Sequence, residues 1–456
     1  MQALDKLADV FAGEIIVPSD PGYDEARRVW NAMADRRPAL IVRPTSADDV
    51  ATALRFARER DLVVAVRGGG HSIPGLSTVD DGIVIDLSRM RGAEVDPEQR
   101  LAKVPGGALL GDLDDAAQQH GLACPVGVVS HTGVGGLTLG GGMGRLMRRF
   151  GLTIDNLAAV ELVTADGRQV RASEDENPEL LWGLRGAGAN FGIAVAFEFR
   201  LHPLEPPVTH GSVIHPIDRA ADLAAIFTEL TTNGPRDLWL SYELGPGAPA
   251  EAYALEAHDG PIASINVHHS GPPAAAERDL AELRAFGPPL ADTIQVKTYL
   301  QAQHLNDEPQ AWGRRFYMKS AFLPTLPDEL VAAFVAQVDR MPSDVEGIVS
   351  IWAWGGAIAD VPEDATAFSG REAAFWGSAE VMWEDEALDE ASREWGKAAV
   401  AEMAPYALTG RYVNDVAESG EDIDSIYGPG KHARLLALKR EWDPDNVFRL
   451  NQNIRP

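Results

Sequence analysis

The chain has 456 residues, of which 45% are hydrophobic and 24% charged, and its formal net charge at pH 7 is −28. That length exceeds one ordinary hydrophobic core and predicts two domains. The negative charge argues against nucleic acid or an anionic membrane as partner. The single cysteine excludes an internal disulfide framework. With no apolar run near the roughly 20 residues of a membrane span and no secretory signal, we expect a cytoplasmic protein.

The first 200 residues alternate strand and helix patterns. A short buried strand is predicted at 40–42, and Ser46 caps a helix that runs to about Arg58. Further strands are predicted from short apolar or alternating runs at 62–66, 83–87, 160–164 and 193–201.

Two dipeptides mark turns and helix starts within this region. Asp166-Gly167 predicts a hairpin turn after the strand at 160–164. Asn177 is expected to cap a helix whose first residue is Pro178, a position that proline favours.

A glycine-rich loop follows the strand at 62–66 and reads Arg67-Gly68-Gly69-Gly70-His71-Ser72. Glycine permits backbone conformations closed to other residues and a close approach to a ligand. Successive N–H groups in such a turn form a concave anion site suited to a pyrophosphate. The His71 imidazole then stands where it reaches whatever the loop holds.

A second cluster at residues 133–144 holds seven glycines in twelve positions. Each glycine costs a helix about 1 kcal/mol relative to alanine, so we expect a loop here. The cluster matches neither the dinucleotide-binding fingerprint nor the P-loop. It is either a structural loop or, together with the first loop, a backbone cradle for a long, flat, phosphorylated cofactor.

The composition changes after Pro203, Pro206 and Pro207, where we place a domain boundary. Beyond it, alternating stretches and amphipathic helices follow one another. Strands are expected at 294–299 and 348–354, and helices at 327–338 and 387–403.

Four stretches resemble the berberine-bridge-enzyme-like branch of the vanillyl-alcohol-oxidase flavoproteins, which share a PCMH-type FAD-binding domain. They are residues 67–72, the glycine cluster with 151–156, residues 181–186 with 190–192, and residues 439–449. Their order and spacing fit across nearly the whole chain. The resemblance implies a two-domain α+β fold.

In that fold, residues 1–206 form the FAD-binding domain. Residues 207–411 form a substrate-binding domain built on an antiparallel sheet flanked by helices. Residues 412–456 return to the FAD-binding domain.

The resemblance also implies FAD bonded covalently to His71 through its 8α-methyl group. Many relatives add a second bond from a cysteine four residues before the second glycine cluster. Val129 stands at that position, and Cys124 lies five residues too early, so we expect a single attachment and a small buried thiol. No metal site is expected. The other cofactor-binding candidates are Arg67, Gly68, Gly69, Gly70, Ser72, Gly75, Val129, Thr132, Gly133, Gly135, Gly136, Thr138, Gly140, Gly141, Gly142, Gly144, Asn156, Gly192, Ile193, Asn451 and Asn453.

Hydride transfer to flavin N5 needs a base, or a group that stabilises an anion, because the substrate also loses a proton. The resemblance favours Tyr412, which would project with Asn414 from one face of a strand. Glu384 loosely aligns with the catalytic glutamate of plant relatives, although a solvated helix start explains it as well. His131, just before the glycine cluster, is the third candidate.

Ser350, Trp352 and Trp354 share one face of a predicted strand, where amine-handling relatives present charged side chains. They either pack in the core or form an aromatic wall. A wall would suit a phenol, polyketide, alkaloid or aromatic alcohol, and a cation–π contact would admit amines.

The sequence therefore predicts a FAD-dependent oxidase, a monomer or homodimer, that acts on a small organic substrate and reduces O₂ to H₂O₂. The alternatives are a flavin-dependent dehydrogenase or natural-product cyclase on the same scaffold, or a flavin-binding protein without activity. A hydrogen peroxide assay and flavin bleaching separate these alternatives.

Overall fold

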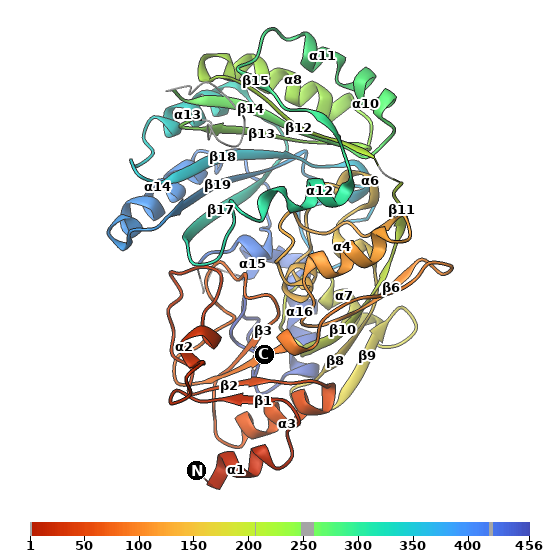
Figure 1. The fold of residues 1–456 in the computed structure, drawn as a ribbon, viewed down its shortest axis with the longest axis vertical. Helices are drawn as coiled ribbons and strands as arrows, with labels where there is room; N and C mark the ends of the chain where they lie inside the picture. The colour runs from red at the N-terminus through yellow and green to blue at the C-terminus, as the bar shows by residue number, and fades with distance from the viewer. Residues whose placement is uncertain (1, 206, 248–259, 419–422) are drawn as a thin grey trace.

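The computed structural model describes residues 2–205, 207–247, 260–418 and 423–456 (Figure 1). It mixes helices with antiparallel sheets, as expected. Two sheets from the first 200 residues occupy the lower half of Figure 1, and an eight-stranded sheet lies above them. Within these ranges, no helix is long and apolar enough to cross a membrane.

The four-stranded sheet has the order β1-β2-β4-β3. The predicted strand–helix–strand unit is present, and Ser46 caps its helix by accepting a hydrogen bond from Asp49 N. However, β4 inserts between the two strands of that unit and pairs in parallel with both. The elements are β1 (Glu14–Ile16), β2 (Leu40–Arg43), α3 (Ala47–Arg58), β3 (Val64–Arg67) and β4 (Ile83–Asp86), preceded or interrupted by α1 (Gln2–Ala8) and α2 (Tyr23–Ala26).

The five-stranded sheet is antiparallel, with the order β5-β6-β10-β8-β9. The predicted turn at Asp166-Gly167 joins β8 to β9. The strands are β5 (Glu94–Asp96), β6 (Leu101–Pro105), β8 (Leu157–Val163), β9 (Gln169–Ser173) and β10 (Ile193–Arg200). Around them lie α4 (Leu110–Gln118), α5 (Val134–Leu139), α6 (Met147–Phe150), α7 (Pro178–Leu184) and the short pair β7 (Leu122–Ala123) and β11 (His202–Pro203).

Two local predictions in this half were wrong. The glycine cluster contains the six-residue helix α5, because its left-handed positions come only afterwards, at Gly141 (φ 133°) and Gly142 (φ 80°). Asn177 makes no side-chain cap. It lies in the left-handed region at φ 50°, and its amide donates to the Arg171 carbonyl. Pro178 does begin α7.

The eight-stranded sheet has the order β15-β12-β14-β13-β18-β19-β17, with β16 paired to β12. Its strands are β12 (Val208–Pro216), β13 (Leu238–Gly245), β14 (Ile262–His269), β15 (Ala291–Asp292), β16 (Gln295–Lys297), β17 (Arg315–Leu323), β18 (Glu346–Ala353) and β19 (Phe375–Trp383). The helices are α8 (Ala220–Asn233), α10 (Pro273–Asp279), α11 (Ala281–Ala285), α12 (Tyr299–Gln303), α13 (Asp328–Val338) and α14 (Asp389–Ala401).

The two faces of this sheet have different roles, because side chains alternate along each strand. One face packs against α8, α13 and α14 through residues such as Phe227, Phe334 and Trp395. The other face carries Trp239, Phe316 and other large side chains that pack toward the first half of the chain. We call the second face the cavity face.

The strand predicted at 294–299 is only three residues long. Thr298 stops it by capping α12, since its hydroxyl accepts a hydrogen bond from Gln301 N at 3.1 Å. The strand predicted at 348–354 and the helices predicted at 327–338 and 387–403 are confirmed, with ends that differ by at most two residues.

The last segment contains a 3₁₀ turn η7 (Val413–Asp415), α15 (Ile423–Tyr427) and α16 (Pro429–Trp442). In Figure 1, α15 and α16 lie in the lower half, beside α7 and the five-stranded sheet. The fully buried Lys439 fixes this arrangement, because its ammonium donates to the Asn190 and Phe448 carbonyls and to Asp443.

The domain limits 1–206, 207–411 and 412–456 stay a proposal. The sheets divide between residues 14–203 and 208–383, which supports them. Residue 206 itself lies outside the described residues.

Candidate active site

A cavity of about 370 Å³ lies between the two halves of the chain. Both glycine-rich loops line it, together with the cavity face of β17, β18 and β19 and residues 412–416 and 450–452. Among the described residues, its lining includes no lysine or arginine. The ionisable side chains there are His71, Glu380, Tyr412 and Asp415.

The two glycine-rich loops touch backbone to backbone at the cavity wall. A Cβ on Gly69 would lie 2.2 Å from Gly133 N, a distance that no side chain tolerates. The next residue, Gly70, has φ 74°, a left-handed conformation that favours glycine. The contact therefore requires glycine on both loops and brings His71 to the cavity.

The His71 ring is held on three sides by other rings. Trp30 stacks on it at 4.9 Å between ring centroids, and Trp312 meets it edge-on at 6.1 Å. His71 Nε2 lies 2.7 Å from His131 Nδ1. This packing leaves Nδ1 of His71 nearest to Thr132, whose hydroxyl is 3.5 Å away.

The partners of His131 determine which ring nitrogens carry protons. His131 Nε2 lies 3.3 Å from the Asp307 carbonyl, which only accepts, so Nε2 must donate. His131 Nδ1 then accepts from His71 Nε2, and the lone pair of His71 sits on Nδ1. Burial, with a smaller contribution from His131, lowers the pKa of His71 to about 3, so its ring is neutral at physiological pH.

Tyr412 lines the cavity, but from a different local structure than predicted. It precedes the 3₁₀ turn η7 and is not part of a strand. Its own backbone is extended, at φ −74° and ψ 114°, and the chain turns after it. Its hydroxyl accepts hydrogen bonds from Gly142 N at 3.2 Å and from Asn414 Nδ2 at 3.0 Å. Burial raises its pKa well above the ordinary value, so Tyr412 is a neutral phenol.

Of the two glutamates, Glu380 lies at the cavity and Glu384 does not. Glu384 follows the end of β19, is exposed and does not line the cavity. Glu380 lies four residues earlier on the cavity face, where Ser378 Oγ donates to its carboxyl at 2.9 Å. Burial raises the pKa of Glu380 to about 7, with a further contribution from the nearby Glu243. This value is close to that of an efficient general base at neutral pH.

Each of the two alternatives for the tryptophans holds for one of them. Trp352 lines the cavity, and its cross-strand partner Trp376 lines it too, with ring centroids 5.2 Å apart. Trp354 lies beyond the end of β18 and is fully buried against Phe322 and Phe368.

Several cofactor-binding candidates line the cavity, and the others support its walls. Those in the lining are Gly68, Gly69, Gly70, His71, Ser72, Val129, Thr132, Gly133, Gly136 and Asn451. Those outside it are Arg67, Gly75, Gly135, Thr138, Gly140, Gly141, Gly142, Gly144, Asn156, Gly192, Ile193 and Asn453.

The contacts of this second group explain why its members do not line the cavity. The Arg67 guanidinium turns away and donates to the Ala26 carbonyl at 2.6 Å. The Asn156 amide donates to the Phe150 and Leu152 carbonyls. Ile193 belongs to a hydrophobic core. The glycines at 140–144 allow close packing of other segments, as where Thr153 crosses Gly142.

Sequence reasoning missed Trp30, Trp376, Glu380 and Asp415. For Trp376 and Glu380 the sequence did hold a signal, since their spacing places them on the same face of one strand. Nothing local marked Trp30, which lies 41 positions before the histidine that it covers. The single cysteine, Cys124, is fully buried, and burial raises its thiol pKa.

The comparisons with known proteins agree with this geometry. A family model described as "FAD binding domain" matches residues 38–173, and one described as "Berberine and berberine like" matches residues 418–455. The (R)-6-hydroxynicotine oxidase of Paenarthrobacter nicotinovorans is 32% identical over 97% of each chain. The chain belongs to the berberine-bridge-enzyme-like FAD-linked oxidoreductases. The family is enzymatic.

Two solved structures of the family are similar throughout. The 6-hydroxy-D-nicotine oxidase of Arthrobacter nicotinovorans has a TM-score of 0.87 at 30% identity, covering 98% of each chain. The glucooligosaccharide oxidase of Acremonium strictum, whose title names a 6-S-cysteinyl, 8α-N1-histidyl FAD, shares the fold with a TM-score of 0.88 at 24% identity, covering 100% of this chain and 99% of the other.

The residues of the cavity fit FAD. Both loops line the cavity with glycine backbone, whose N–H groups suit a phosphate chain. Asn451 lines the cavity with a buried side-chain oxygen that has no hydrogen-bond partner among the described residues. Such an oxygen is matched by the ring N–H or hydroxyl groups of a flavin cofactor.

Proposed function

We propose that this enzyme is an oxidase that takes hydride from a small, flat organic molecule, with O₂ as electron acceptor and H₂O₂ as product. The substrate class is phenolic, alkaloid or another aromatic alcohol or amine. The observation that carries the proposal is that His71, Glu380 and the indoles of Trp352 and Trp376 line one cavity.

We propose that FAD is held by a single covalent bond through His71. The lone pair on Nδ1 makes that atom the nucleophile. The neutral state of the ring supports this assignment, because an imidazolium has no free nitrogen lone pair. His131 Nδ1 accepts the hydrogen bond from Nε2 and so keeps the lone pair of His71 on Nδ1. A second bond is not proposed, since Val129 lines the cavity where some relatives have cysteine.

Glu380 is the proposed base. When bound, FAD accepts the hydride at N5 of its ring. Glu380 removes the accompanying proton from a hydroxyl or amino group of the substrate. The neutral Tyr412, first favoured as base, holds its proton too tightly for that role and instead positions the reacting group by hydrogen bonding.

The wall of Trp352 and Trp376 supports a flat substrate. With two carboxyls and no cationic side chain in the described lining, a substrate carboxylate or phosphate would lack a partner. An amine would find Glu380 and the indole faces. The name of the nicotine-oxidising relative supports the inclusion of hydroxylated pyridine amines in any test.

Two measurements test the proposal. After acid precipitation, yellow colour should remain in the pellet of the wild type and be released from His71→Ala. A panel of phenols, benzylic alcohols and amines, with (R)-6-hydroxynicotine among them, is then assayed for H₂O₂ and for flavin bleaching. Bleaching without recovery in air would indicate a dehydrogenase, and a panel without any bleaching would contradict the oxidase.

We also propose a cytoplasmic monomer or homodimer without nucleic-acid or membrane partners. The formal charge of −28 and the single, buried cysteine support these proposals.

A further inference from the structure

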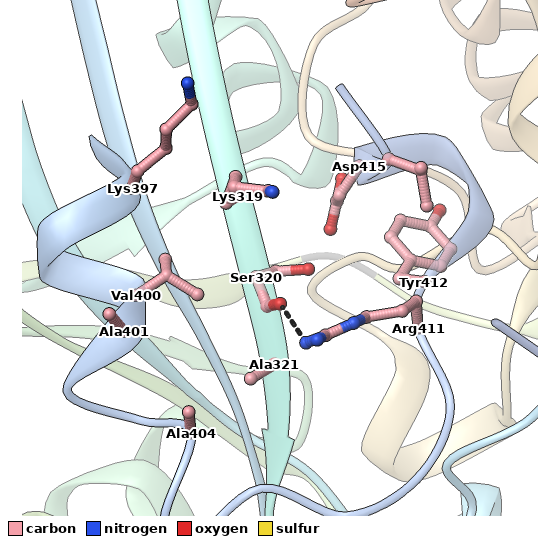
Figure 2. A pocket seen from close by; sticks show the side chains of 11 residues that line it. Lys319, Ser320, Ala321, Lys397, Val400, Ala401, Ala404, Arg411, Tyr412 and Asp415 are labelled. Carbon is pink, nitrogen blue, oxygen red and sulfur yellow. Dashed lines mark hydrogen bonds between the residues drawn. The ribbon is translucent and has the colours of Figure 1, made fainter. Parts of the chain in front are cut away.

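A second pocket lies on the far side of Asp415 from the cavity. Its volume is about 240 Å³, and it opens at the edge strand β17, against α14 and residues 411–416 (Figure 2). Tyr412, Asp415 and Val416 line both this pocket and the cavity. We call it the edge pocket.

A row of small polar side chains crosses the sheet on its cavity face. Glu243 of β13 stands opposite Ser350 of β18, Ser350 opposite Ser378 of β19, and Ser378 opposite Ser320 of β17. Directly opposed side chains have Cβ atoms roughly 5 Å apart, which brings their hydroxyls within reach of one another. Met318 and Phe322 flank Ser320, and Trp376 and Glu380 flank Ser378, so the row forms a polar seam that borders Glu380.

The seam connects Glu380 with Asp415. Ser378 Oγ donates to Glu380 at 2.9 Å, and Ser378 faces Ser320. In Figure 2 the Asp415 carboxyl points toward Ser320 across the edge pocket. Ser320 and Trp376 both favour the ionised form of Asp415, and the charge of Glu380 acts in the opposite direction.

Asp415 is buried, and among the described residues its Oδ2 has no hydrogen-bond partner. Burial raises the pKa of Asp415 well above the ordinary value and so favours its protonated form. A protonated carboxyl and a hydroxyl each both donate and accept hydrogen bonds, which is what a proton relay requires.

The charges around the edge pocket suit the delivery of that proton to water. Lys319 and Lys397 line the pocket and pair with Glu418 at 3.5 Å, while Arg411 donates to the Ser320 carbonyl at 3.2 Å. Lys397 also pairs with Glu394 at 3.0 Å, so three cationic groups face two carboxylates among the described residues, and the remaining positive charge attracts anionic proton acceptors such as phosphate.

We propose that Ser378, Ser320 and Asp415 form a proton exit route from Glu380 to the edge pocket. This proposal rests on Glu380 as the base. A substrate that fills the cavity separates Glu380 from the water there. Asp415 releases its own proton into the edge pocket and receives one through the hydroxyls of Ser320 and Ser378 from Glu380. The net change is one proton moved from substrate to solvent, with no change of oxidation state along the route.

The first test needs no substrate. Infrared spectra of the holoenzyme at neutral pH should contain a carbonyl band of a protonated carboxyl that is lost in Asp415→Asn. On transfer into D₂O, this band should shift at least tenfold faster than the slowest backbone amides exchange, which the amide II band reports in the same sample. An ionised Asp415, or exchange as slow as that of these amides, would overturn the route.

The second test follows protons during a single anaerobic turnover with whichever panel compound bleaches the flavin. A pH indicator reports proton release to solvent, and absorbance reports bleaching. In Ser378→Ala and Asp415→Asn, proton release should lag at least tenfold behind bleaching of the same variant. Ser350→Ala is the matched control, because it removes one hydroxyl from the other side of the row. In this variant, proton release and flavin bleaching should have the same rate.

The outcomes separate the two proposals. If proton release is as fast as bleaching in both Ser378→Ala and Asp415→Asn, the route is refuted, while the assignment of Glu380 as base is unaffected. Bleaching of Glu380→Gln at the wild-type rate would refute the base assignment itself.

Discussion

Replacement of Glu380 by glutamine should abolish activity and stabilise the protein, and the second effect should depend on pH. The carboxyl has a pKa of about 7 in the folded protein against an ordinary value of 4.5. The difference of roughly 2.5 pH units corresponds to roughly 3 kcal/mol at 1.36 kcal/mol per unit. This energy opposes ionisation of Glu380 within the fold.

The sign follows from proton linkage. Below pH 4.5 the carboxyl is protonated in both states and has no effect on the free energy of unfolding. Between pH 4.5 and 7 the unfolded chain loses this proton while the folded chain keeps it, so the wild type loses stability as pH rises. Above pH 7 the loss is constant. Glutamine does not ionise, and Glu380→Gln therefore avoids this loss of stability.

The assay is the unfolding midpoint of both holoproteins between pH 4.5 and 9. The stability of Glu380→Gln relative to the wild type should grow by roughly 3 kcal/mol up to pH 7 and then level off. Its rate of flavin bleaching should fall by 10²- to 10⁴-fold, the usual contribution of a general base. A stability difference that does not vary with pH would refute the raised pKa, and with it the physical basis for choosing this base.

Three further substitutions probe the site and its support. Gly69→Ala should yield protein without bound flavin, because the new methyl group collides with the facing loop, whereas Gly22→Ala, which meets nothing within 4 Å, should stay yellow. Trp352→Ala should raise KM for aromatic panel compounds at least tenfold while changing kcat less, and equal losses in both would contradict a binding wall. Arg371→Met removes the partner of a buried carboxylate and should cost about 3–5 kcal/mol in thermal unfolding. The exposed Arg236→Met should cost less than about 1 kcal/mol, and similar costs for the two would argue against burial as the cause.

The cofactor side of the site was predictable because its residues are contiguous. Three glycines and His71 follow one strand directly, and their role needs only local backbone geometry. The substrate side was not, because Glu380 reaches the cavity from a strand about 300 residues away. Alternation placed it on one face of that strand but could not say which face the cavity would use.

One wrong prediction and one alternative left open show where local rules gave way to tertiary structure. Glycine content argued against helix at α5, yet packing of the whole cluster overrides a propensity of about 1 kcal/mol per residue. Trp354 has the sequence spacing of Trp352, but β18 ends at Ala353, and the second indole leaves the sheet to pack against phenylalanines.

The position of residues 450–452 has a consequence for biosynthesis. They form part of the cavity wall, and Lys439 anchors their segment to the first half of the chain. A nascent polypeptide that still lacks them has the glycine loops and His71 but an incomplete chamber. Cofactor capture must therefore wait until the ribosome has delivered this segment, and partial translation products should emerge colourless.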